Sequence, residues 1–194
     1  MKNLETYADL ILKNAPVRIK RSEELNKKFD TIANEIYHCP VRNESKRKFT
    51  TVLFSVEKMV IEHALAQSTG MILNPLEFDY RNRQSYAYDV IDPDNNATFE
   101  CKRWAEKWFS FNQKDVNTFL KNTDIVDYFV SGKVLRTTEY FTVFFHLVAD
   151  AKSFKQFIRP SQYNNKLYYD HVAAMRKNVA VYCDHVYFEN GEAA

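Results

Sequence analysis

The fold is decided by the stretch Tyr86-Ala-Tyr-Asp-Val-Ile-Asp-Pro-Asp-Asn-Asn-Ala-Thr-Phe-Glu-Cys-Lys-Arg-Trp104. Residues 86–91 and 97–104 are rich in aromatic and β-branched residues, which favour strands. Residues 93–96 between them have the composition of a turn, because proline fixes φ and Asp and Asn tolerate left-handed backbone. The stretch therefore predicts a β-hairpin.

Four charged side chains lie inside these strand segments, and three of them, Asp89, Glu100 and Lys102, form the pattern considered next. With a loop of residues 93–96, Asp92 faces Ala97, and counting back along the ladder places Asp89 opposite Glu100. Opposed residues lie roughly 5 Å apart at Cβ. Lys102 points to the same face as Glu100 because side chains alternate along a strand. Two opposed carboxylates repel each other, so we expect a cation between them, and a divalent metal is the natural candidate.

The order Asp89, ten residues, Glu100-Cys101-Lys102 resembles the D-x(n)-E-x-K signature of the PD-(D/E)XK nucleases, which have the restriction-endonuclease-like fold. The resemblance covers about residues 50–133 and rests on a short motif. It implies an α/β (α+β) fold in which helices flank a mixed sheet. It also implies that Asp89, Glu100 and the carbonyl of Cys101 bind Mg²⁺, for which Mn²⁺ can substitute. Lys102 is implied to position or deprotonate the attacking water.

The helix expected before the hairpin supplies a candidate third acid. Residues 50–69 have helical patterning and end at Gly70, a residue typical of a helix C-terminus. At about 100° per residue, Glu57 falls among apolar residues, whereas Glu62 falls on the polar side with its i,i+4 partner Lys58. In the resembled family this helix often contributes an acidic ligand, so we expect Glu57 to be the third acid. The alternative is that the stem of Glu57 packs while its carboxylate reaches solvent.

The aspartate of the motif has two competitors. The literal Pro-Asp sequence is Pro93-Asp94, only six residues before Glu100, and it falls in the turn. Asp92 is the other competitor. We favour Asp89, although it follows Tyr88 and not a proline.

Basic and aromatic residues near the hairpin are candidate contacts with DNA, because cations neutralise phosphates and aromatic rings stack on unpaired bases. The candidates are Arg81, Arg83, Trp104, Lys46, Arg47 and Lys48. The alternatives are a solvated loop for residues 41–48 and core packing for Trp104.

The composition excludes several classes of protein. Of the 194 residues, 45% are hydrophobic and only three are glycine, which excludes glycine-rich phosphate loops. The net charge of +2 is a weak hint of an anionic partner.

The sequence predicts a cytoplasmic protein without a membrane span. It has three cysteines without paired spacing, a polar N-terminus and no long apolar run. A zinc site made by residues 38–39 and 183–185 matches no zinc-binding spacing.

We expect a single nuclease domain of residues 1–194. Residues 1–49 would form a helical N-terminal extension that contains a short basic link at 17–21, and residues 134–194 would complete the fold around the 50–133 core. Helices are expected at 4–14, 22–37, 50–69, 151–158 and 170–177, and strands at 125–135, 139–148 and 178–188.

The resemblance implies a Mg²⁺-dependent endodeoxyribonuclease that degrades foreign or host DNA. The general character of the chain is similar to that of the DNA-degrading endonucleases of T-even phages. The alternatives are a junction resolvase or exonuclease on the same core, and a non-catalytic nucleic-acid-binding domain. The sequence also leaves two further alternatives open, namely an RNA substrate and assembly as a homodimer.

Overall fold

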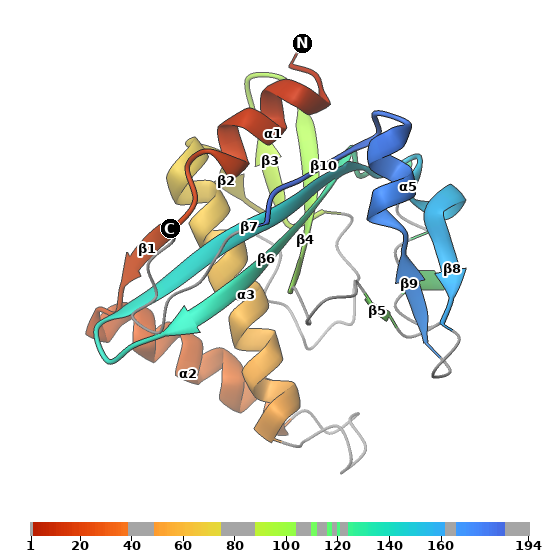
Figure 1. The fold of residues 1–194 in the computed structure, drawn as a ribbon. Coiled ribbons are helices and arrows are strands. Elements are labelled where there is room, and N and C mark those ends of the chain that lie inside the picture. Colours follow the sequence, from red (N-terminus) through yellow and green to blue (C-terminus); the bar gives the residue numbers. More distant parts are fainter. Residues whose placement is uncertain are drawn as a thin grey trace.

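A mixed sheet is the centre of this computed structural model, which describes residues 2–38, 49–74, 88–103, 110–111, 116–117, 120, 124–161 and 166–184. Within these residues the strand order is β1-β7-β6-β4-β3-β2, and β10 also pairs with β7 (Figure 1). The strands are β1 (Val17–Lys20), β2 (Ile72–Leu73), β3 (Val90–Asp92), β4 (Ala97–Arg103), β6 (Tyr128–Arg136), β7 (Tyr140–Asp150) and β10 (Ala180–Tyr182).

The predicted hairpin is formed by β3 and β4. Asp92 pairs with Ala97 and Val90 pairs with Phe99, which confirms the register expected from a four-residue loop. Residues 93–96 form the turn, and Asn96 adopts φ of 52°, a left-handed conformation that asparagine tolerates.

The sheet continues from the hairpin through a parallel pair. β4 pairs with β6 in parallel, and β6 returns as the antiparallel partner of β7. The register between β6 and β7 shifts at Ser131 and Gly132, where Ser131 faces Leu147 and Gly132 faces Phe145. β7 thus has one extra residue, His146, at this bulge.

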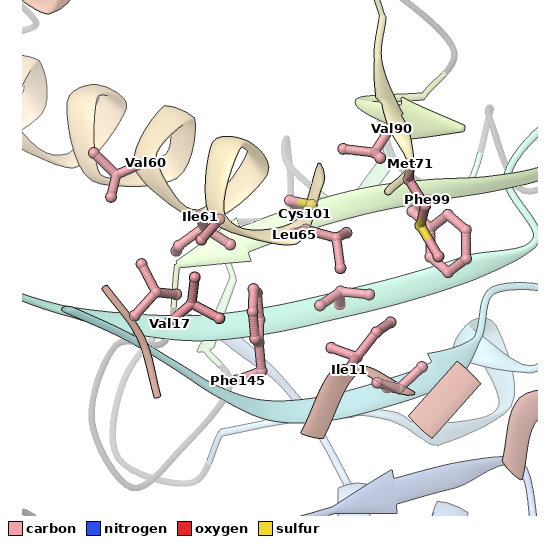
Figure 2. Close-up of a cluster of buried hydrophobic side chains, with 14 of the residues drawn as sticks. Ile11, Val17, Val60, Ile61, Leu65, Met71, Val90, Phe99, Cys101 and Phe145 are labelled. Atoms are coloured by element: carbon pink, nitrogen blue, oxygen red, sulfur yellow. The ribbon is translucent and has the colours of Figure 1, made fainter. Parts of the chain in front are cut away.

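One face of the sheet is covered by α1 (Leu4–Leu12), α2 (Glu23–His38) and α3 (Phe49–Thr69). Figure 2 shows Ile61 and Leu65 of α3 gathered with Cys101 and Phe99 of β4. Burial of these apolar side chains, at about 25 cal/mol per Å², fixes α3 against the hairpin. α3 ends at Gly70, whose φ of 74° confirms the predicted C-terminal glycine.

The other face carries a smaller core. Phe129 of β6 and Leu147 of β7 pack there with residues of η2 (Phe154–Phe157), a 3₁₀ helix, and α5 (His171–Arg176). A small sheet of β5 (Ser110–Phe111), β9 (Leu167–Tyr169) and β8 (Ile158–Pro160) lies beside α5 (Figure 1). Asp170 caps α5 by accepting a hydrogen bond from the Ala173 backbone N–H, as expected for a helix that begins there.

The structure confirms a mixed α/β architecture with flanking helices but corrects three elements. The prediction of a basic link at 17–21 is wrong, since Val17–Lys20 is a strand paired with β7. The N-terminal segment is therefore not wholly helical. The helix expected at 151–158 is a turn followed by the four-residue η2. Within the described part of the strand expected at 178–188, only Ala180–Tyr182 is strand, and residues 185–188 lie outside the described residues. In the part of the chain described, no helix is long and apolar enough to cross a membrane.

Candidate functional site

Asp89 lies directly before β3 and is buried, with 6% of its surface exposed. Its backbone N–H donates at 2.8 Å to the carbonyl of Phe99, the residue that pairs with Val90 at the end of the β3–β4 ladder. Its Oδ2 accepts a 2.6 Å hydrogen bond from the Cys101 backbone N–H. The aspartate is therefore fixed against the strand that carries Glu100.

The cation that adjoins these acids is the ammonium of Lys58. Lys58 Nζ lies 2.8 Å from Asp89 Oδ1, 3.0 Å from Glu62 Oε1 and 4.0 Å from Glu100 Oε1. A lysine side chain extended from α3 thus reaches three carboxylates from two different parts of the fold. Asp89 and Glu100 thus approach a cation, as expected from their opposed charges, and this cation is a protein ammonium.

The predicted lysine of the motif contacts the predicted glutamate. Lys102 Nζ forms an ion pair with Glu100 Oε1, the same oxygen that Lys58 approaches. Ser131 Oγ donates to the Lys102 carbonyl at 3.2 Å, from the neighbouring parallel strand β6. Asp89, which precedes β3, therefore lies close to Glu100 and Lys102 of β4.

Both glutamates of α3 are buried, but Glu62 and not Glu57 lies in the acid cluster. Glu62, expected on a polar side, is completely buried and pairs with Lys58 beside Asp89. Glu57, expected to be the third acid, is bound instead by two arginines: Arg103 Nε contacts its Oε2, and Arg136 Nη2 lies 3.2 Å from its Oε1.

The helical pattern predicts Glu62 on a solvent-facing side, and this prediction is wrong because α3 contacts the sheet and two other helices. Its supposedly polar side faces the hairpin and not solvent. A sequence signal for this was present, since Glu62 lies in the otherwise apolar segment Met59-Val-Ile-Glu-His-Ala-Leu65. A buried carboxylate needs a charged partner, and Lys58 at i,i+4 spacing supplies it.

The charges of the cluster leave a net negative site. The carboxylates of Asp89, Glu62 and Glu100 outnumber the ammoniums of Lys58 and Lys102 by one. Such a site favours a cation of higher charge, and carboxylate oxygens are the donors that Mg²⁺ and Mn²⁺ prefer.

The thiol beside this cluster is not a good metal donor. Burial, together with the negative charge of Asp89, raises the pKa of the Cys101 thiol well above its ordinary value. The thiol therefore stays protonated, and only the backbone carbonyl of Cys101 is left as a ligand candidate.

The carboxylate and carbonyl oxygens of this cluster are donors of the type that a hard divalent cation prefers. In this structure the ammonium of Lys58 takes the place of such a cation. In the described ranges, however, no three His, Cys, Asp or Glu side chains form a group ready to hold a metal ion. Glu100 Oε1 is 4.0 Å from Lys58 Nζ and is already paired with Lys102. A metal at this position requires the ammonium of Lys58 to move.

The competing aspartates of the hairpin have other surroundings. Asp92 Oδ2 accepts hydrogen bonds from Tyr7 Oη at 2.8 Å, Asn95 Nδ2 at 2.9 Å and Lys2 Nζ at 3.3 Å, which ties the N-terminus to the hairpin turn. Burial alone would raise the pKa of Asp92, but these hydrogen bonds outweigh it and lower the pKa. Asp94 is an exposed residue of the turn.

The predicted DNA contacts Arg81, Arg83, Trp104, Lys46, Arg47 and Lys48 lie outside the described residues. Residues 39 and 185 of the zinc alternative also lie outside them.

No protein-family model matches this chain, and no curated protein matches it significantly.

Proposed function

We propose that the protein is a Mg²⁺-dependent endodeoxyribonuclease of restriction-endonuclease-like fold that hydrolyses DNA phosphodiester bonds. The observation that carries this proposal is the approach of Asp89, the residue before β3, and Glu100 of β4 to the same cation, with Lys102 in contact with Glu100. Hydrolysis of a phosphodiester needs charge neutralisation and an oriented water, and this set of side chains is suited to both.

The order of elements supports the proposed fold. α3 precedes the β3–β4 hairpin, and β6 then lies parallel to β4 in the same sheet. The resembled family places a helix, an acid-bearing hairpin and a further strand in this order. The N-terminal β1 and the C-terminal β10 both pair with β7, so the regions outside the motif extend the same sheet.

The residues that would hold the metal are Asp89, Glu100 and the carbonyl of Cys101, while Glu62 is the neighbouring acid of α3. When bound, Mg²⁺ would lower the pKa of the attacking water and neutralise charge on the phosphate oxygens. The hydrogen bond from Cys101 N–H holds Asp89 Oδ2 in place, so the aspartate needs little rearrangement.

Lys102 is the residue proposed to act on the water. Its ammonium lies on the same strand face as Glu100 and can donate a hydrogen bond to the water or to a phosphate oxygen. The overall reaction adds water across a P–O bond and yields one phosphate monoester and one hydroxyl. We propose degradation of foreign or host DNA as its use.

A cleavage assay tests this proposal. The wild-type protein is incubated with MgCl₂ or MnCl₂ and with circular duplex, circular single-stranded, cytosine-modified and four-way-junction DNA. Cleavage of a circular DNA identifies an endonuclease, since an exonuclease needs an end. Cleavage restricted to junctions or to linear ends would instead favour a resolvase or an exonuclease.

The variants of this assay separate catalysis from binding. Glu100→Ala and Lys102→Ala should abolish cleavage, and Glu100→Ala should still bind DNA. Asp94→Ala is the matched control, because it removes an exposed acid from the same hairpin and should cleave like the wild type. Wild-type protein that leaves every DNA form uncut with both metals would contradict the proposal.

A further inference from the structure

The ammonium of Lys58 occupies the position at which the three acids of the site converge. It contacts Asp89 Oδ1 at 2.8 Å and Glu62 Oε1 at 3.0 Å, and these two side chains are 8% and 0% exposed. Carboxylates buried this closely repel one another unless a cation screens them. Lys58 is thus the group that allows the acids to be assembled in a protein without metal.

We propose that Lys58 is a built-in counter-cation that a divalent metal must displace, and that it thereby sets the metal concentration at which the site fills. This inference rests on the proposed function for the identity of the metal ligands. It assigns to Lys58 a role distinct from that of Lys102, which contacts Glu100 alone among these acids.

The two cations cannot share the position. Mg²⁺ binds carboxylate oxygens at about 2.0–2.1 Å, whereas the Lys58 ammonium already lies 2.8 Å from the nearest of these oxygens. Charge repulsion between a divalent metal and an ammonium at contact distance would also oppose their sharing this position.

Lys58 has an exit route. Its side chain is 31% exposed, whereas that of Glu62 is completely buried. The flexible stem can therefore carry the ammonium outward while Glu62 and Asp89 stay in place. The displaced ammonium would then be available to solvent or to a phosphate of the substrate.

A titration of MnCl₂ into the metal-free protein, followed by calorimetry, tests the displacement. Lys58→Met keeps the stem and removes the charge, so it should bind Mn²⁺ at least about tenfold more tightly than the wild type. In EDTA the same variant should melt at a lower temperature than the wild type, and MnCl₂ should restore more of its stability. Lys13→Met is the matched control, because Lys13 is an exposed lysine that pairs with Asp9 on α1.

A second measurement uses only the wild-type protein, so it does not depend on whether Lys58→Met folds. Lysines are acetylated with a hydroxysuccinimide ester, with and without MnCl₂, and the labelling is read by mass spectrometry. Labelling of Lys58 should rise on addition of MnCl₂, while labelling of Lys13 should not change. Unchanged labelling of Lys58 in protein that has bound Mn²⁺ would overturn the inference.

The outcomes separate this inference from the proposed function. If Lys58→Met and the wild type bind Mn²⁺ equally and the wild type cuts DNA, the counter-cation role is overturned and the nuclease stands. If Lys58→Met binds Mn²⁺ more tightly but neither protein cuts DNA, the counter-cation role stands and the nuclease is overturned. Absence of Mn²⁺ binding to both proteins overturns both.

Discussion

The backbone N–H of Cys101 donates a 2.6 Å hydrogen bond to the side chain of Asp89. Cys101 lies between Glu100 and Lys102, so this bond joins the aspartate that precedes β3 to the middle of the Glu-x-Lys segment of β4. The other oxygen of Asp89 lies against Lys58. Both oxygens of this carboxylate therefore have defined partners before any metal binds.

Asp89→Asn should lower DNA cleavage at least about a hundredfold, because the amide lacks the charge that binds a divalent cation. The amide nitrogen would also face either the Cys101 N–H or the Lys58 ammonium, and both of these are donors. Initial cleavage rates at saturating MgCl₂ give the effect. Asp94→Asn serves as the control, and an equal loss in both variants would contradict the assignment of Asp89.

Glu62→Gln and Glu57→Gln should have different effects. Glu62→Gln should weaken Mn²⁺ binding and slow DNA cleavage, because Glu62 shares the Lys58 ammonium with Asp89. Glu57→Gln should retain cleavage and lower the free energy of unfolding by roughly 1 kcal/mol, since its arginine partners are about one-third exposed to solvent. Loss of cleavage in Glu57→Gln alone would restore the original prediction from the helical pattern.

Tyr7→Phe should lower the free energy of unfolding by about 1–3 kcal/mol, because it removes a hydrogen-bond donor from the buried Asp92. The ring contact with Phe99, at a centroid distance of 5.0 Å, is retained by phenylalanine. Urea denaturation at pH 7 measures the change. Stability equal to that of the wild type would show that the hydrogen bond contributes nothing measurable.

The contribution of Asp92 to stability should depend on pH in the acid range. Its pKa is lowered in the folded protein, so its stabilisation is present above the unfolded pKa of about 3.9 and is lost as the pH falls through the folded pKa. The difference in unfolding free energy between the wild type and Asp92→Asn should thus be constant from pH 7 to about 5 and should shrink below about 4. A difference that grows on acidification would contradict the direction of this shift.

Gly132→Ala should destabilise the protein by about 1–3 kcal/mol. A Cβ at this position would lie 3.1 Å from the Phe144 carbonyl oxygen and 3.4 Å from Phe145 Cδ1, inside the bulged pairing of β6 and β7. Because Gly132 faces Arg103 across the parallel pair, the strain would reach the end of β4. Thermal unfolding of the variant provides the test, and an unchanged melting temperature would show that the bulge accommodates a methyl group.

The hairpin could be predicted from local sequence because its turn, its strand residues and its register are all set within residues 86–104. The position of Glu62 could not, because a helical pattern alone does not show which side of α3 packs against the hairpin, and Glu62 lies buried on that side. Strand β1 was missed for a similar reason. Its alternating residues Val17 and Ile19 are buried only because β7, more than a hundred residues later, pairs with them. The local sequence predicts only the i,i+4 pair of Lys58 with Glu62, since the contact of Lys58 with Asp89 depends on how α3 crosses the hairpin.

The central claim is that Asp89 and Glu100 bind one divalent cation together. Calorimetric titration of MnCl₂ into the wild type, Asp89→Asn and Glu100→Gln tests this claim directly, with Asp94→Asn as the control. We predict that the wild type and the control bind one Mn²⁺ per chain and that each of the other two variants loses this binding. Unaltered Mn²⁺ binding in both Asp89→Asn and Glu100→Gln would contradict the account.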